Sequence, residues 1–268
     1  MWIDTHCHLE TAEFSGRERQ IARDARKMGV IQIVIPSVDR TSFERAATLA
    51  HACDNCSYAL GIHPMYVPHS TEDDLAVLEE ALAQGLADPR LVAIGEIGLD
   101  FYVPELAESP LREKQEHFLV EQLKMAKKYE LPVLLHTRRS VDTVMKHLRQ
   151  QGIRQGIAHA FSGSFQQAGA FIDQGFKISF CGTCTYERAR QLRKLAAELP
   201  IDAIVVETDA PDLSPVWKNR KENSPLELPR IGETVAALRG ISPDELARHT
   251  CRNAMEAIPR LAPLLMKG

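Results

Sequence analysis

Histidine and carboxylate side chains occur in short clusters from one end of the chain to the other. The clusters are His6 and His8, His63, Glu96, His136, His159, and Glu207 with Asp209. Imidazole and carboxylate ligands together suit Zn²⁺, Mn²⁺, Fe²⁺ or Co²⁺ better than Mg²⁺ alone. Two such ions about 3.5–4 Å apart hold a nucleophile between them and stabilise an in-line displacement at phosphorus. The residue types therefore indicate metal-assisted hydrolysis.

Each cluster follows a short apolar or β-branched run, and these runs predict the strands that position it. Eight strands are expected, at Met1–Thr5, Ile31–Pro36, Ser57–Gly61, Leu91–Glu96, Leu131–His136, Gly156–Ala160, Phe176–Phe180 and Ala203–Thr208. Helical patterns separate them, at Arg17–Met28, Ser42–Ala52, Thr71–Ala83, Leu111–Tyr129, Ser140–Gln151, Phe165–Gln174, Tyr186–Leu199 and Leu228–Leu238. Strict alternation indicates a parallel sheet with right-handed crossovers. Eight such units in 268 residues favour an α/β fold closed into a (β/α)₈ TIM barrel.

The remaining segments add little to this architecture. Residues 1–268 are expected to form a single domain, because no linker rich in Pro, Gly or Ser divides them. A ninth helix, Pro243–Ala257, is expected to pack outside the barrel. The longest irregular stretch, Pro211–Pro229, is expected to be an active-site loop, since barrel chemistry lies on the loops after the strands. No Gly-x-Gly-x-x-Gly follows the first strand, which excludes the usual dinucleotide site.

The C-terminal ends of the strands of a closed barrel meet at one mouth, where these clusters would come together. A lone histidine at a strand end is more often structural than a ligand. Six histidine and carboxylate residues on five strands, all at the same end of the barrel, favour a metal site. His6 and His8 project to the same side and can chelate one ion, and Glu96 can bridge two. Asp209 can ligate a metal and accept the proton of the attacking water, so Asp209 and Glu96 are the expected catalytic residues.

Other residues near these clusters have more than one interpretation. Glu207 shares a strand with Asp209 and is expected to support a ligand or to bind an extra ion. His63 is expected to contact substrate or to support a ligand, and Asp100 is expected to be structural or to support a ligand. The Arg138 side chain could bind phosphate oxygens, or it could simply be exposed to solvent at the start of a helix. Trp217 and the three cations that follow it, within Trp217–Lys221, could stack a base and contact a nucleic-acid backbone. The alternative is an exposed loop with a packed tryptophan.

Six motifs together resemble the TatD-type deoxyribonuclease family of amidohydrolase-like, metal-dependent hydrolases, over nearly the whole chain. They are Asp4-Thr5-His6-Cys7-His8, Gly61-Ile62-His63-Pro64, Gly95-Glu96-Ile97-Gly98-Leu99-Asp100, Leu135-His136-Thr137-Arg138, His159-Ala160-Phe161-Ser162-Gly163 and Glu207-Thr208-Asp209-Ala210-Pro211. The resemblance implies two divalent metal ions (Zn, Mn, Co, Fe or Mg) and nuclease activity. The ligands it implies are His6, His8, Glu96, His136, His159 and Asp209, with Glu96 bridging.

The chain departs from the family pattern at two places. Ala160 stands where the family often has cysteine, and Lys221-Glu222-Asn223-Ser224-Pro225 replaces a common Arg-Asn-Glu-Pro motif. These departures indicate a separate branch of the family, with the same metal ligands and scope for another substrate.

Two Cys-x-x-Cys pairs could form a four-cysteine zinc site on spacing alone. Cys53 and Cys56 precede the third predicted strand, however, whereas Cys181 and Cys184 follow the seventh. The pairs would lie at opposite ends of the barrel, so both are expected to be free thiols.

The net charge of −4 argues against a protein that coats DNA with a basic surface. The N-terminus does not resemble a secretory signal, and no window approaches the roughly 18 apolar residues of a membrane span. We therefore expect a cytoplasmic protein with nucleic acid as substrate, no membrane association and no obligate protein partner.

These observations favour a two-metal phosphodiesterase acting on DNA, at ends or single strands. Hydrolysis of another ester or amide is the alternative, as in D-aminoacyl-tRNA deacylation or a ring amidohydrolase. Many cyclic amidohydrolases bridge their metals with a carboxylated lysine on the fourth strand, where this chain has Glu96. A non-enzymatic protein with a structural metal is a third possibility, but structural sites are usually closed four-coordinate cages.

Overall fold

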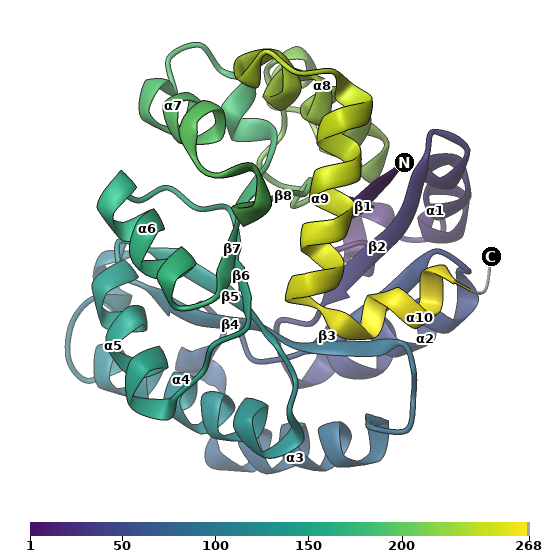
Figure 1. Cartoon of the computed structure of the whole chain (residues 1–268). Helices are drawn as coiled ribbons and strands as arrows, with labels where there is room; N and C mark the ends of the chain where they lie inside the picture. Colours follow the sequence, from purple (N-terminus) through teal and green to yellow (C-terminus); the bar gives the residue numbers. More distant parts are fainter. Residues whose placement is uncertain (267–268) are drawn as a thin grey trace.

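Eight parallel strands form a nearly closed barrel with helices around it (Figure 1). The computed structural model describes residues 1–266. The strands are β1 (Trp2–Asp4), β2 (Val30–Pro36), β3 (Cys56–Leu60), β4 (Leu91–Asp100), β5 (Val133–Arg138), β6 (Gly156–Ala158), β7 (Phe176–Phe180) and β8 (Ile204–Val206). Each pairs in parallel with the next along the chain. The predicted (β/α)₈ TIM barrel is confirmed, with all eight strands.

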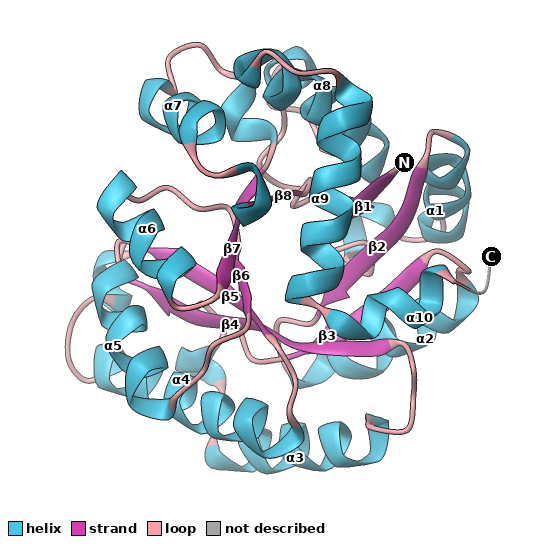
Figure 2. Cartoon of the chain, viewed as in Figure 1, coloured by secondary structure: helices cyan, strands magenta, loops and turns pink. Residues whose placement is uncertain are grey.

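Helices alternate with the strands and cover the outside of the barrel (Figure 2). They are α1 (Glu18–Lys27), α2 (Phe43–Ala52), α3 (Glu72–Gly85), α4 (Leu111–Tyr129), α5 (Val141–Gln151), α6 (Phe165–Asp173), α7 (Arg190–Glu198), α8 (Leu228–Arg239), α9 (Pro243–Ala257) and α10 (Ala262–Leu265). Side chains of Ser164 and Ser242 cap the first turns of α6 and α9. Within residues 1–266, no helix combines the length and apolar character needed to cross a bilayer.

The apolar side chains form two layers. The larger layer lies between the strands and the surrounding helices. The smaller one contains inward residues such as Val34, Val92 and Val205, and fills the barrel itself. The strands are thus buried on both faces, which explains why they read as continuous apolar runs in the sequence.

Helix α9 does more than pack against the outside of the barrel. Ala254 and Ala257 near its end, together with Ile258 and Leu261 just beyond it, join the apolar layer inside the barrel. The segment therefore closes the N-terminal end of the barrel, opposite the mouth. The sequence predicted a helix here that packs outside the barrel, but it did not show that the end of the helix reaches the inner apolar layer.

The first and last strands meet along a seam that polar side chains stabilise. The Thr5 amide donates to the Val206 carbonyl at 3.4 Å. Asp4, fully buried, accepts hydrogen bonds from the Thr208 amide (2.9 Å) and hydroxyl (2.6 Å). Burial raises the pKa of Asp4 to about 7, although the bonds from Thr208 oppose this shift. These bonds fix the loops that carry candidate ligands on either side of the seam.

Candidate metal centre

The side chains after β1 and β8 converge with Glu96 of β4. The Nε2 atoms of His6 and His8 lie 3.2 Å apart, and Glu96 Oε2 lies 3.1 Å and 3.4 Å from them. Asp209 Oδ1 is 3.8 Å from both nitrogens. Four donors thus point into one small space, as one metal position requires.

The other carboxylate oxygen of Glu96 faces a second group of histidines. Glu96 Oε1 lies 2.9 Å from His136 Nδ1, 3.4 Å from His63 Nε2 and 3.8 Å from His159 Nε2. Glu96 therefore presents one oxygen to each of two donor groups. This is the geometry expected of a carboxylate that bridges two ions.

An irregularity in β4 directs Glu96 toward the mouth. Ile94 pairs with Val133 and Ile97 with Leu135, so β4 has one residue more than β5 over this interval. Gly98 permits the close approach that follows: its φ is +151°, and a Cβ there would lie 1.9 Å from the His136 carbonyl oxygen. The Gly-Glu-Ile-Gly sequence thus specifies where the carboxylate points.

Two buried carboxylates orient histidines from behind. Glu207 Oε1 lies 2.8 Å from His159 Nδ1, and Asp100 Oδ2 lies 3.1 Å from His136 Nε2. In each case the other ring nitrogen faces Glu96. A carboxylate that accepts one imidazole N–H fixes the ring and leaves the second nitrogen free to ligate a metal. The structure therefore places Glu207 and Asp100 behind two of the candidate ligands, in the supporting position that the sequence suggested for each.

Burial and neighbouring charges change the acidity of the whole cluster. Burial lowers the pKa of His6 to about 3 and raises that of Asp209 to about 7. Burial opposes a charge on His159, but Glu207, Asp209 and Glu96 raise its pKa to about 10. The histidines hold the pKa of Glu96 well below its usual range despite burial. Glu96 is thus an anion, as a bridging ligand must be.

The donor set fits divalent metal ions. In the described part of the chain, three groups have ligand atoms within 4.8 Å of one another: His6, His8 and Asp209; His6, His159 and Glu207; and His63, Glu96 and His136. Buried nitrogen and carboxylate donors packed this closely are compensated when they coordinate a cation. None of the three groups includes a cysteine.

One residue of this centre was not predicted, and another lies closer to the donors than expected. His63 was expected to contact substrate or to support a ligand, and its Nε2 lies among the donors of the second group. Glu10 was not identified at all: it is buried, neither of its carboxylate oxygens has a hydrogen-bond partner among residues 1–266, and Oε1 lies 3.9 Å from His8 Nδ1. The alternating spacing of His6, His8 and Glu10 was the available signal.

The predicted substrate contacts differ in their surroundings. The Arg138 side chain is 46% exposed, and its guanidinium lies 3.7 Å from the centre of the Tyr102 ring, after β4. Trp217 is partly buried; its Nε1 donates to Glu227 at 2.7 Å and Arg230 covers its ring. These contacts favour the packed alternative for Trp217.

All six cysteines are free thiols. Cys56 begins β3, whereas Cys181 directly follows β7, so the two Cys-x-x-Cys pairs lie at opposite ends of the barrel.

A TIM barrel with imidazole and carboxylate ligands gathered at its C-terminal mouth defines a class of metal-dependent hydrolases. Solved structures agree with this assignment. The chain superposes on YjjV, a TatD homologue from Escherichia coli K12, with a TM-score of 0.90 at 37% identity, covering 96% of this chain and 98% of that one. A TatD family hydrolase from Entamoeba histolytica shares the fold, with a TM-score of 0.82 at 20% identity, covering 96% of this chain and 97% of that one.

Residues 3–258 match the family model described as TatD related DNase, and the chain belongs to this family. The uncharacterized metal-dependent hydrolase YjjV of Escherichia coli K12 is 38% identical over 94% of this chain and 95% of its own length. A human relative named deoxyribonuclease TATDN3 is 29% identical over 99% and 97%. The protein is therefore a TatD family metal-dependent hydrolase.

Proposed function

We propose that this protein hydrolyses phosphodiester bonds in DNA with two divalent metal ions, acting on ends or single strands. The observation that carries the proposal is Glu96, whose two oxygens face two separate donor groups. Two ions held by one carboxylate suit displacement at phosphorus, where both the attacking and the leaving oxygen need stabilisation. The human relative named a deoxyribonuclease supports the same chemistry.

The residues of the metal centre have different roles in the proposed hydrolysis. Bound divalent ions acidify a water molecule and stabilise negative charge on the phosphoryl group. Asp209, whose carboxylate reaches the mouth beside His6 and His8, is placed to accept the proton of the attacking water. Glu207 and Asp100 keep His159 and His136 in place throughout. Attack breaks the bond from phosphorus to the leaving oxygen and yields a phosphomonoester and an alcohol.

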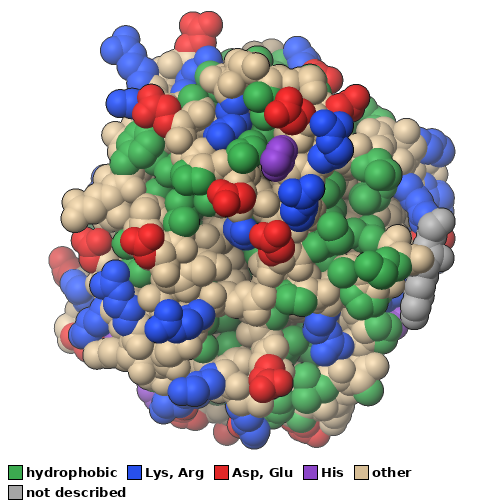
Figure 3. All heavy atoms as spheres, viewed as in Figure 1, with side chains coloured by type: hydrophobic (Ala, Val, Ile, Leu, Met, Phe, Trp, Pro, Cys, Tyr) green, Lys and Arg blue, Asp and Glu red, His purple; other side chains and the backbone are tan. Residues whose placement is uncertain are grey.

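Exposed aromatic side chains at the mouth support a preference for unpaired bases. Tyr66, 42% exposed, and Tyr102, 48% exposed, follow β3 and β4. Arg138 and Arg139 lie over the Tyr102 ring, at 3.7 Å and 4.7 Å. Aromatic faces and cations together bind single strands without sequence specificity. The opposite face, over α9, mixes cations, anions and apolar groups (Figure 3).

The test is hydrolysis by metal-reconstituted protein of labelled single-stranded DNA, double-stranded DNA, RNA and D-aminoacyl-tRNA. We expect single-stranded DNA to be cleaved fastest. Release of the amino acid without cleavage of any phosphodiester would instead establish the deacylase alternative.

A further inference from the structure

A cavity beside the metal centre is not explained by the metal ligands. It has a volume of about 630 Å³, within the range of ligand pockets. Its walls are the loops after β7 and β8, with Glu13 from the loop after β1. Pro211 and Asp212 belong to its lining, and the Asp212 amide donates to the Asp209 carbonyl at 2.8 Å. The cavity therefore adjoins the loop that carries Asp209.

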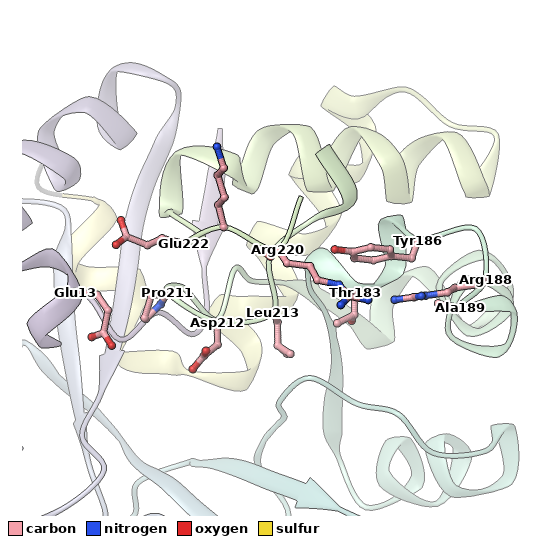
Figure 4. Close-up of a pocket in the computed structure, with 12 residues that line it drawn as sticks. Glu13, Thr183, Tyr186, Arg188, Ala189, Pro211, Asp212, Leu213, Arg220 and Glu222 are labelled. Atoms are coloured by element: carbon pink, nitrogen blue, oxygen red, sulfur yellow. The ribbon is translucent and has the colours of Figure 1, made fainter. Parts of the chain in front are cut away.

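Two arginines converge at one end of the cavity. Figure 4 shows the guanidinium groups of Arg188 and Arg220 directed toward one another near Thr183, beside the Tyr186 ring. Within residues 1–266, neither guanidinium has a carboxylate oxygen within 4.0 Å. Both side chains are exposed, so water screens their mutual repulsion, and an anion bound between them would be attracted by both.

The carboxylates of the cavity lie at its other end. Glu13, Asp212 and Glu222 are on the far side from the arginines in Figure 4, and Glu222 pairs with Arg17 at 3.3 Å. Ala189, which precedes the first turn of α7, also lines the cavity and does not cap that turn with its side chain. The positive end of the α7 dipole therefore adds to the potential at the arginine end.

The backbone around Arg220 adopts an unfavourable conformation. Asn219 and Arg220 both have positive φ, at +52° and +61°. Left-handed conformations are unfavourable for a side chain such as arginine, and they persist where the surrounding structure imposes them. The loop is thus shaped to direct Arg220 into the cavity, whereas its neighbour Lys218 is 3.6 Å from Glu227.

We infer that Arg188 and Arg220 form a phosphate subsite, which binds a non-scissile phosphate of the nucleic-acid substrate while the metals hold the scissile one. A guanidinium fork matches phosphate oxygens in geometry as well as charge. Tyr186 is placed to contact the adjoining sugar or base. The inference rests on the proposed phosphodiesterase function and specifies how the enzyme distinguishes an oligonucleotide from a small ester.

Kinetics on two substrates test the subsite. We expect Arg188→Gln and Arg220→Gln each to raise the KM for a trithymidylate about ten-fold, with hydrolysis of bis-p-nitrophenyl phosphate unchanged. Arg248→Gln, an exposed arginine on α9, is the matched control and should change neither. An unaltered KM for the trinucleotide in both cavity variants would overturn the inference.

A binding measurement separates this inference from the proposed function. Fluorescence anisotropy of a labelled hexathymidylate with metal-free protein requires no cleavage. The double variant should bind about ten-fold more weakly than wild type, and its slope of log K against log salt should be shallower by about 0.7, as for one lost phosphate contact. Equal binding by wild type and double variant would eliminate the subsite even if the enzyme is a nuclease. Weakened binding in an enzyme that cleaves no phosphodiester would retain the subsite and refute only the proposed reaction.

Discussion

Glu96 is central to the candidate metal centre, because each of its two carboxylate oxygens faces a different donor group. Its importance could be predicted from the sequence, since it ends an apolar run that belongs to a series of strand ends. The direction of each oxygen could not, because that depends on the extra residue in β4 and on Gly98. The position of Glu10 could not be predicted for a similar reason, because only the folded loop brings its carboxylate near His8.

Replacing Glu96 by Ala should reduce phosphodiester hydrolysis by several orders of magnitude, because the two donor groups lose their shared ligand. Steady-state kinetics with metal-saturated protein measure the loss. Glu113→Ala, an exposed position on α4, is the control and should retain full activity. Near-normal turnover by a folded Glu96→Ala protein would refute the two-metal assignment.

Asp100→Asn should weaken metal binding about 10–100-fold, since His136 loses the carboxylate that fixes its ring. Titration of the metal-free protein with Zn²⁺ or Mn²⁺ measures the affinity directly. Excess metal should restore much of the turnover, which a general disruption of the fold would not allow. Unchanged affinity would show that Asp100 only supports the loop through its bond to the Tyr102 amide.

At the scale of elements, the strands were predictable and the loops were not. Burial on both faces gives each strand an unbroken apolar run, which the sequence displays directly. Tyr186–Ala189 reads as the start of a helix, but α7 begins only at Arg190, and the preceding residues line the cavity. Good helix formers there are overridden by tertiary contacts. Likewise, the pattern of Trp217–Lys221 shows an aromatic residue among cations, but not that Arg230 covers the ring.

Trp217→Ala should therefore affect stability more than specificity. We expect the free energy of unfolding to fall by about 2 kcal/mol, and the activities on single-stranded DNA and on bis-p-nitrophenyl phosphate to fall by the same factor. Denaturant unfolding and the ratio of the two activities are the measurements, with Val216→Ala, an exposed neighbour, as control. A ten-fold loss on DNA alone would restore the stacking interpretation.

At the scale of the molecule, the apolar layers and the metal centre occupy different parts of the barrel. Ile258 and Leu261 cover the side chains inside the barrel at its N-terminal end, whereas the candidate metal ligands lie at the mouth. Stability and chemistry are thus supplied by separate sets of residues. The count of strand–helix units predicted that the sheet closes into a barrel. It did not predict that the N-terminal end of the barrel is covered, because that depends on where α9 ends.

Dialysis against a chelator should consequently abolish hydrolysis without unfolding the protein. Far-UV circular dichroism should be preserved, and added divalent metal should restore activity, because the apolar layers do not depend on the ions. Joint loss of the circular dichroism signal and of activity would contradict this separation.

The seam between β1 and β8 also determines when the enzyme becomes active. Asp4 and Thr208, which join across it, are 204 residues apart in sequence, and His6, His8 and Asp209 flank that junction. A chain emerging from the ribosome cannot complete this donor group until its eighth strand has been synthesised and has docked on the first. We therefore expect the metal to bind late in biosynthesis, and we expect a chain that has not yet docked its eighth strand to be inactive.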